Sequence, residues 1–336
     1  MKIRNIAIIA HVDHGKTTLV DCLLHQSGLF RDNQQVAERA MDSNVLERER
    51  GITILAKCTS VDWSGTRINI VDTPGHADFG GEVERILSMV DGVMILVDAS
   101  EGPMPQTKFV LTKALSLNLN PIVIINKVDR SDQRADQVHD EIFDLFVALN
   151  ANEKQLDFPT LFASAKNGWA TADPNSRSED MAALFDLIVK HVPPPNVNPG
   201  GGFSLLVTTL ETDPYLGRVL TGRIQSGEVR QNMSIKALNR DSVKIEASRI
   251  TKLLQFRGLE RLPVEEAYAG DIVAIAGFQN ATVSDTLCDN SITKALKALP
   301  IDPPTLAMTF SINDSPLAGT EGSKVTSREI WNRLER

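Results

Sequence analysis

The sequence holds little that would suit a secreted or membrane-embedded protein. Only three of its 336 residues are cysteines, Cys22, Cys58 and Cys288, and their wide separation fits neither a zinc site nor a disulfide framework. No apolar run approaches the roughly 18 residues of a membrane span. The N-terminal stretch 1–16 lacks the small-residue cleavage site of a signal peptide. We therefore expect a cytoplasmic chain without membrane contact.

The chain also lacks a surplus of positive charge. It has 35 Lys and Arg residues against 43 Asp and Glu residues, which gives a formal net charge of −8. Nucleic-acid-binding domains usually carry the opposite balance, so the charge argues against extensive nucleic-acid binding by this chain alone. Its 42% hydrophobic and 23% charged residues are ordinary for a globular protein, and its length allows two or three domains.

The first half of the chain alternates strand and helix patterns. Apolar residues recur at helical spacing over 79–90 and 181–189. Short apolar runs, typical of strands buried on both faces, lie at 3–10, 67–72, 93–98 and 121–126. This alternation predicts an α/β domain with a mixed, mostly parallel sheet, whose ligands bind at the carboxyl ends of the strands.

The composition changes after residue 190. The proline- and glycine-rich stretch 191–202 predicts a linker. From 203 to 300, short apolar runs are separated by glycines, which predicts a small antiparallel β-barrel. We therefore predict a first domain at 1–195 and a β-barrel domain at 203–300.

A second break, "PIDPP" at 300–304, precedes the last stretch of the chain. One strand is predicted at 305–312 and one helix at 327–334, with Ser327 as its N-cap. One strand and one helix are too little for a domain. We therefore expect residues 304–336 to begin a third, α+β domain that the chain does not complete.

The motif "AHVDHGKTT" (10–18) follows the first predicted strand and opens a helix, as a phosphate-binding loop requires. Lys16 is expected to reach the β- and γ-phosphates, and the Thr17 hydroxyl to bind Mg²⁺. Ala10 stands where the strict motif has glycine, which is tolerable if the backbone does not need a positive φ there. The predicted nucleotide-binding residues of this loop are Asp13, His14, Gly15, Lys16, Thr17 and Thr18.

Two further stretches carry predicted contacts to the metal and the γ-phosphate. "DTPG" (72–75) ends a strand, where Asp72 can bind Mg²⁺ through water and the Gly75 N–H can approach the γ-phosphate. Thr53 is the one hydroxyl between "ERERG" and the apolar residues that follow it. We expect Thr53 to close over Mg²⁺ when a γ-phosphate is present, which makes its loop a switch.

Recognition of the base is predicted at two more strand ends. In "NKVD" (126–129), Asp129 can accept hydrogen bonds from N1–H and the exocyclic amine of guanine, which adenine does not offer. Asn126 and Lys127 are expected to brace the base and the phosphate loop. In "SAK", which comprises Ser164, Ala165 and Lys166, the backbone N–H of Ala165 can meet guanine O6. The four motifs in this order are a far stronger signal than any one alone.

With these residues in view, the chain resembles the translational GTPases, and within them the BipA/TypA branch. The stretches "HVDHGKTT", "RGITI", "DTPGH", "NKVD" and "SAK" match the superfamily, and "TDPYLGRV" and "INDSPLAGTEGSKVTSREI" are most similar to that branch. The resemblance covers essentially the whole chain. It implies a P-loop GTPase domain, a β-barrel domain and the start of a ferredoxin-like domain. Family members continue beyond this point, so we expect an N-terminal portion or a naturally shortened relative.

The resemblance also implies roles for residues that the sequence alone leaves open. His76, directly after "DTPG", positions the attacking water in this family once ribosomal RNA of the sarcin–ricin loop reaches it. Val12 and Ile52 match the two apolar residues that gate this histidine. Asp13 matches a residue that relatives link to a monovalent cation. A helix N-terminus disfavours the imidazolium form, so we expect His76 to be a poor catalyst without its partner.

The function implied by the resemblance is a ribosome-associated GTPase. It would hydrolyse GTP to GDP and phosphate with Mg²⁺, in large-subunit assembly or in translation under stress or low temperature. The expected partners are the ribosome, through rRNA and ribosomal proteins, and tRNA, contacted mainly by domains absent here; the chain itself is expected to be a monomer. One alternative is another translational GTPase, of the ribosome-protection or back-translocase type. The other is a regulatory module that senses guanine nucleotides or an alarmone, with hydrolysis incidental.

Overall fold

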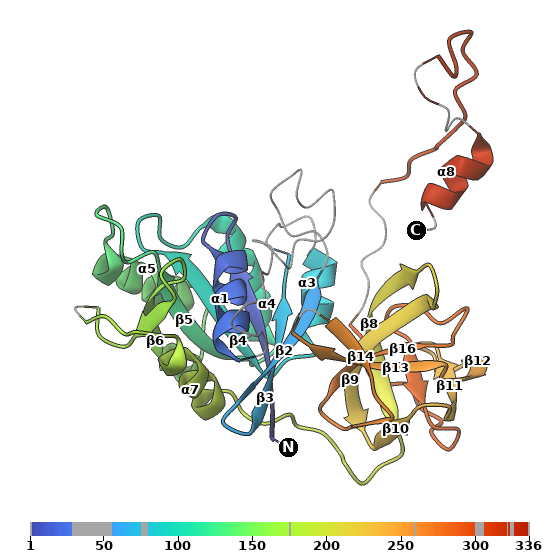
Figure 1. Ribbon diagram of the computed structural model, residues 1–336, viewed down its shortest axis with the longest axis horizontal. Helices are drawn as coiled ribbons and strands as arrows, with labels where there is room; N and C mark the ends of the chain where they lie inside the picture. The colour runs from blue at the N-terminus through green and yellow to red at the C-terminus, as the bar shows by residue number, and fades with distance from the viewer. Residues whose placement is uncertain are drawn as a thin grey trace.

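The computed structural model describes residues 2–28, 56–74, 80–174, 176–258, 260–299, 306–320, 322 and 326–334. Two β-sheets dominate it (Figure 1). We call residues 2–191 the first unit and residues 204–288 the second unit. The segment between them has no helix or named strand, in line with the predicted linker. The domain boundaries placed within this segment stay a prediction.

The sheet of the first unit has the strand order β2-β3-β1-β4-β5-β6-β7. Neighbouring strands run parallel from β3 to β6, whereas β2 and β7 pair antiparallel at the two edges. The strands are β1 (Lys2–Ala10), β2 (Lys57–Trp63), β3 (Thr66–Asp72), β4 (Gly92–Asp98), β5 (Asn120–Asn126), β6 (Thr160–Ser164) and β7 (Trp169–Thr171). The predicted mixed, mostly parallel sheet is therefore confirmed.

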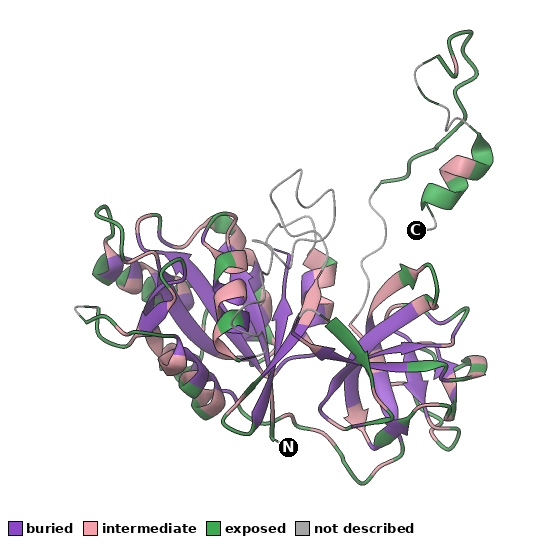
Figure 2. Cartoon of the chain, in the orientation of Figure 1, coloured by how far each residue is buried: buried purple, intermediate pink, exposed green. Residues whose placement is uncertain are grey.

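Helices cover both faces of this sheet, which explains its apolar strands. Ile9 packs into the core under α3, α4 and α5, while its neighbour Ile8 packs into the core under α1 and α7. Central strands are accordingly buried along most of their length (Figure 2). The helices are α1 (Lys16–Gln26), α3 (Gly80–Leu87), α4 (Pro105–Ser116), α5 (Ala135–Ala148), α6 (Glu153–Leu156) and α7 (Ala182–His191). Among the described helices, none combines the length and apolar character that crossing a bilayer requires.

The second unit is antiparallel throughout its named strand pairs, as predicted for this part of the chain. Its larger sheet has the order β12-β11-β17-β8-β9-β16-β13-β14, and β10 pairs with β15. The strands are β8 (Ser204–Asp213), β9 (Gly217–Ser226), β10 (Glu228–Arg230), β11 (Ser234–Leu238), β12 (Lys244–Arg249), β13 (Lys252–Arg257), β14 (Glu260–Pro263), β15 (Glu266–Tyr268), β16 (Ile272–Ala276) and β17 (Thr286–Cys288).

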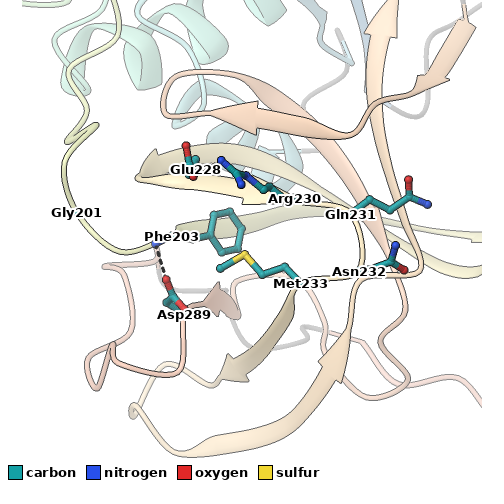
Figure 3. Close-up of a pocket in the computed structure, with 8 residues that line it drawn as sticks. All are labelled: Gly201, Phe203, Glu228, Arg230, Gln231, Asn232, Met233 and Asp289. Atoms are coloured by element: carbon teal, nitrogen blue, oxygen red, sulfur yellow. Dashed lines mark hydrogen bonds and ion pairs between the residues drawn. The ribbon is translucent and has the colours of Figure 1, made fainter.

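An open hollow of about 490 Å³ lies beside β10 in the second unit (Figure 3). Phe203 and Met233 form its apolar part, while Glu228, Arg230 and Asp289 supply charges. These charged groups already have partners: Arg230 pairs with Glu228, and Asp289 accepts a hydrogen bond from the Phe203 N–H at 3.4 Å. The hollow is therefore a wide depression, formed by the second unit and the linker, in which these charged side chains already interact with protein groups.

The two units share an interface that is both polar and apolar. In its polar part, Asn69 donates to Asn5, and Asn5 donates to Asp91 at 3.1 Å and to the carbonyl of Gly270 at 3.1 Å. Asp91 in turn accepts a 2.8 Å hydrogen bond from Arg223 of β9. Asn5 and Asn69 lie on β1 and β3, the strands that lead into two of the nucleotide loops.

Main-chain and apolar contacts complete this interface. The N–H of Gly258 donates to the carbonyl of Ser60 at 3.0 Å, so the end of β13 lies along β2. Val219, Phe256 and Ile272 of the second unit belong to the same buried cluster as the residues under α3 and α4. The hydrophobic core of the first unit therefore continues across the linker.

The last described segment departs from two predictions. Residues 306–314 form no strand, since no described strand lies beside them to complete a ladder, and Leu306, Met308 and Phe310 are exposed. The predicted helix is confirmed as α8 (Ser327–Leu334), but its cap is Thr326 and not Ser327. The Thr326 hydroxyl accepts from the Glu329 N–H at 3.3 Å and the Glu329 carboxylate accepts from the Thr326 N–H at 3.3 Å, which is a capping box.

Candidate nucleotide-binding site

The predicted nucleotide motifs meet at the carboxyl edge of the first sheet, because their strands run parallel and in register (Figure 1). Ile8 of β1 pairs with Asp72 of β3, and Asp98 of β4 pairs with Asn126 of β5. Asn126 in turn pairs with Ala163 of β6. Loops that are up to about 150 residues apart in the sequence therefore start from one edge.

The phosphate loop has the backbone that its sequence requires. Gly15 precedes α1 with φ of 93°, and Asp13 has φ of 65°, so two residues of the turn lie in the left-handed region. A Cβ on Gly15 would lie 2.5 Å from Nδ2 of Asn126, so this position also needs glycine for space. Ala10 ends β1 in extended backbone, where a methyl group costs nothing. The prediction that alanine is tolerated there fits this conformation.

Lys16 and Asp72 form an ion pair in this site. Lys16 Nζ lies 2.8 Å from Asp72 Oδ1 and also donates to the carbonyl of Thr73. The Thr73 hydroxyl fixes this turn by donating to the Ile8 carbonyl at 2.6 Å. The ammonium suits a phosphate oxygen, and the nearly buried carboxylate together with the Thr17 hydroxyl is the type of oxygen donor that Mg²⁺ prefers. The donor set therefore fits a magnesium-bound phosphate.

Asn126 and Lys127 join the base-recognition loop to the phosphate loop. Asn126 Nδ2 donates to the carbonyl of His14 at 2.9 Å, and Lys127 Nζ donates to the carbonyl of Asp13 at 2.6 Å. Asn126 Oδ1 accepts from the Ala165 N–H at 3.0 Å. That N–H, predicted to meet guanine O6, is therefore bonded within the protein here. It serves to fix Asn126 against the "SAK" loop.

The predicted base contacts lie at the surface around this junction. Asp129 and Lys166 are exposed, so both can meet a ligand from solvent. Ser164 is buried, and its hydroxyl accepts from the Asn167 side chain at 2.9 Å, which shapes the loop rather than offering a ligand contact.

Asp98 belongs to this site although no motif pointed to it. It is fully buried at the end of β4, where its Oδ2 lies 2.7 Å from Nζ of Lys127. The backbone N–H and the hydroxyl of Ser100 both donate to Oδ1 at 2.7 Å. Burial raises the pKa of Asp98, but the hydrogen bonds from Lys127 and Ser100 lower it more, to about 2. An apolar run ending in aspartate beside the "NKVD" strand was the available sequence signal.

His14 takes a different place from the one its motif suggests. Its side chain is completely buried beneath the loop, with Nε2 3.2 Å from the carboxylate of Glu101. Burial lowers the pKa of His14, so the imidazole is neutral near pH 7. The residue can serve a nucleotide through its backbone, while its ring supports the loop from below.

Comparison with known proteins accounts for this arrangement. Residues 1–194 match the family described as the elongation factor Tu GTP binding domain. The chain belongs to this family. Residues 217–288, within the second unit, match elongation factor Tu domain 2. The strand order and the four loops of the first unit are thus those of a GTP-binding domain, followed by the β-rich domain that accompanies it.

Relatives within the family are proteins named large ribosomal subunit assembly factor BipA. Those of Buchnera aphidicola and Bacillus subtilis are each 55% identical over 99% of this chain and 54% of their own length. That of Escherichia coli K12 is 53% identical over 100% of this chain and 55% of its own length. The predicted resemblance to the BipA/TypA branch is confirmed. The chain spans about half the length of these curated relatives.

Four residues of the predicted site lie outside the described residues. They are the catalytic candidate His76, its neighbour Gly75, the switch residue Thr53 and the gate residue Ile52. Val12, the other predicted gate residue, is half-buried in the phosphate loop, and Thr18 lies exposed in the first turn of α1. Among the described residues, no three His, Cys, Asp or Glu side chains converge as a metal site. Mg²⁺ in GTPases relies instead on a hydroxyl, water and phosphate oxygens.

Proposed function

We propose that the chain is the nucleotide-binding portion of a ribosome-associated GTPase that acts in large-subunit assembly or in translation under stress. The observation that carries the proposal is the junction at His14, where Asn126 of the guanine motif holds the phosphate loop by a 2.9 Å hydrogen bond. This contact sets the distance between a base site and a phosphate site. Nothing about a structural β-sheet would require it.

The chain's own residues supply most of the proposed mechanism. Asp129 accepts the two guanine donors, and Lys16 exchanges its Asp72 partner for β- and γ-phosphate oxygens. Thr17, Thr53 and Asp72, the last through water, would hold Mg²⁺, which neutralises the phosphate charge when bound. His76 orients the water that attacks the γ-phosphorus, and the bond to the bridging oxygen of GDP breaks. Asp13 is assigned to a monovalent cation on the resemblance alone.

The remaining parts of the proposal concern organisation and partners. Residues 1–195 and 203–300 form the GTPase and β-barrel domains, and residues 304–336 begin a ferredoxin-like domain. The ribosome, with its sarcin–ricin loop, triggers His76, and tRNA contacts belong to later domains. The relatives' name, large ribosomal subunit assembly factor, supports this role. We propose a cytoplasmic monomer.

Multiple-turnover phosphate release tests this proposal. GTP and ATP should be compared with and without ribosomes, together with GDP binding by a fluorescent analogue and with Lys16→Met as a control that removes phosphate contact. In a chain of the relatives' full length, slow turnover of GTP that ribosomes accelerate, and no turnover of ATP, is expected. Tight binding without ribosome-stimulated turnover in a chain of the relatives' full length would instead favour a nucleotide-sensing module.

A further inference from the structure

Glu101 lies where the chain connects two parts of the nucleotide site that the motifs treat separately. It follows β4, three residues after Asp98, and its carboxylate lies 3.2 Å from Nε2 of His14 in the phosphate loop. The Glu101 side chain is 47% exposed, whereas the His14 ring is completely buried. The contact therefore reaches from the surface to the underside of the loop.

The groups around the His14 ring determine which of its two nitrogens carries the hydrogen. A carboxylate can only accept, so Glu101 needs N–H at Nε2. Nδ1 then presents a lone pair to the backbone N–H of Asp98, 3.3 Å away, rather than a hydrogen to the Leu96 carbonyl, which lies 3.4 Å from Nδ1. This neutral tautomer satisfies both ring nitrogens at neutral pH. Glu101 thus fixes the tautomer as well as the orientation of the ring.

His14 is held from two directions at the tightest point of the loop. Its carbonyl accepts from Asn126, and its ring is bonded to Glu101. Asp13 on one side and Gly15 on the other have positive φ, a conformation that is unfavourable for the non-glycine Asp13. A strained turn of this kind persists only when surrounding contacts hold its backbone in place. The contact between the His14 ring and Glu101 is one of them.

Glu101 is itself secured from α5. The guanidinium of Arg134 donates to the Glu101 carbonyl at 3.0 Å and to the Ser100 carbonyl at 2.9 Å. Arg134 also pairs with Glu141 of α5, with 3.2 Å between Nη2 of the arginine and Oε2 of the glutamate. Since Arg134 is the N-cap residue of α5 and follows "NKVD" closely, the base-recognition loop and the phosphate loop are linked through Glu101 as well as through Asn126.

We propose that Glu101 is a positioning residue for the phosphate loop, acting through the His14 ring. It keeps the backbone N–H groups of the loop directed at the diphosphate and so slows nucleotide release. The inference rests on the proposed function, because it presumes a guanine nucleotide in the site. It assigns Glu101 no contact with the nucleotide itself.

The test measures release of a fluorescent GDP analogue from the 336-residue chain at pH 7.5. Glu101→Ala should release it about threefold to tenfold faster, which is the worth of one net hydrogen bond. Glu101→Gln keeps an acceptor oxygen and should restore most of the slow release. Asp144→Ala, which removes an exposed carboxylate from α5, is the matched control and should leave release unchanged. Preference for GDP over ADP should be the same in all four proteins.

Two further measurements separate positioning from general damage to the fold. A double-mutant cycle with His14→Gln should show that Glu101→Ala adds nothing once the ring is gone. Imidazole nitrogen NMR of the nucleotide-free chain should show His14 as the Nε2–H tautomer, and Glu101→Ala should lose that preference. Unchanged release in Glu101→Ala, full additivity in the cycle, or an Nδ1–H tautomer would each overturn the proposal. Failure of the parent chain to bind GDP would instead refute the proposed function.

Discussion

Asp98 and Lys127 form an ion pair, with 2.7 Å between Oδ2 and Nζ, at the neighbouring ends of β4 and β5. The same ammonium donates to the carbonyl of Asp13 at 2.6 Å. A buried carboxylate thus holds the lysine that supports the phosphate loop. Asp98 therefore supports the loop in two ways, through Lys127 and through its own backbone N–H, which lies 3.3 Å from Nδ1 of His14.

Replacing Asp98 by asparagine tests this dependence through pH. The pKa of Asp98 in the folded chain is about 2, below the value of about 3.9 for an unfolded aspartate. Its carboxylate therefore stabilises the fold above about pH 4, and this contribution is lost as the pH falls from about 4 to about 2. Urea unfolding should show that Asp98→Asn is less stable at pH 7 and that its stability changes less with pH in that window. A variant whose stability follows the parent's pH dependence would contradict the prediction, and Asp144→Asn serves as the exposed control.

Substituting Gly15 separates backbone strain from crowding. Gly15→Ala places a Cβ 2.5 Å from Asn126 Nδ2 at φ of +93°, whereas Gly65→Ala, at φ of +74°, meets nothing within 4 Å. Gly65→Ala should cost about 1 kcal/mol of stability from strain alone. Gly15→Ala should cost more and should also abolish tight GDP binding, because Asn126 must move. Thermal unfolding and GDP titration of both variants measure these effects. If Gly15→Ala changed stability and GDP binding no more than Gly65→Ala does, the contact with Asn126 would be contradicted.

Guanine specificity should depend on Asp129. Asp129→Asn leaves the size of the side chain unchanged but presents a donor to guanine's donors. Mismatched polar groups in a site built for hydrogen bonds cost a factor of about 10⁴ in discrimination. GTP affinity should fall steeply, and xanthosine triphosphate, which offers an acceptor at that position, should bind the variant better than GTP does. Isothermal titration with both nucleotides checks the reversal, and undiminished GTP binding would exclude the assignment.

Replacing His76, which lies outside the described residues, should slow GTP hydrolysis without weakening nucleotide binding. His76→Ala removes a group that acts only near the transition state. Stimulated turnover should fall by a factor on the order of 10²–10⁴, while GTP and GDP dissociation constants change little. Phosphate release with ribosomes, in a chain of the relatives' full length, is the measurement. Turnover that survives the substitution would remove His76 from the mechanism.

The sequence predicted the parts of this molecule that local patterns encode. Strands β1, β4 and β5 are largely apolar because helices cover both faces of the sheet, and β1, β3 and β5 each end at a nucleotide motif. The loop positions follow from the strands. The linker and the antiparallel second unit could also be predicted, because proline, glycine and short apolar runs are local signals.

What the sequence did not reveal depends on contacts between distant residues. The partner of His14 is Glu101, 87 residues away, and nothing in either motif marks that glutamate. The strand predicted at 305–312 has the alternating pattern of a strand, but a strand requires a hydrogen-bonded neighbour, and none of the described residues provides one. At α8 the sequence predicted Ser327 as the cap, whereas the reciprocal hydrogen bonds with Glu329 are made by Thr326.

The apolar core that crosses the linker has a consequence for how the chain melts. Val219, Phe256 and Ile272 are buried in one cluster with residues of the first unit, and the Asp91–Arg223 pair that joins the two units is largely buried. Neither unit can lose its packing without exposing part of the other's core. Heating should therefore produce one cooperative transition in calorimetry, with calorimetric and van't Hoff enthalpies in agreement, rather than two separate melts.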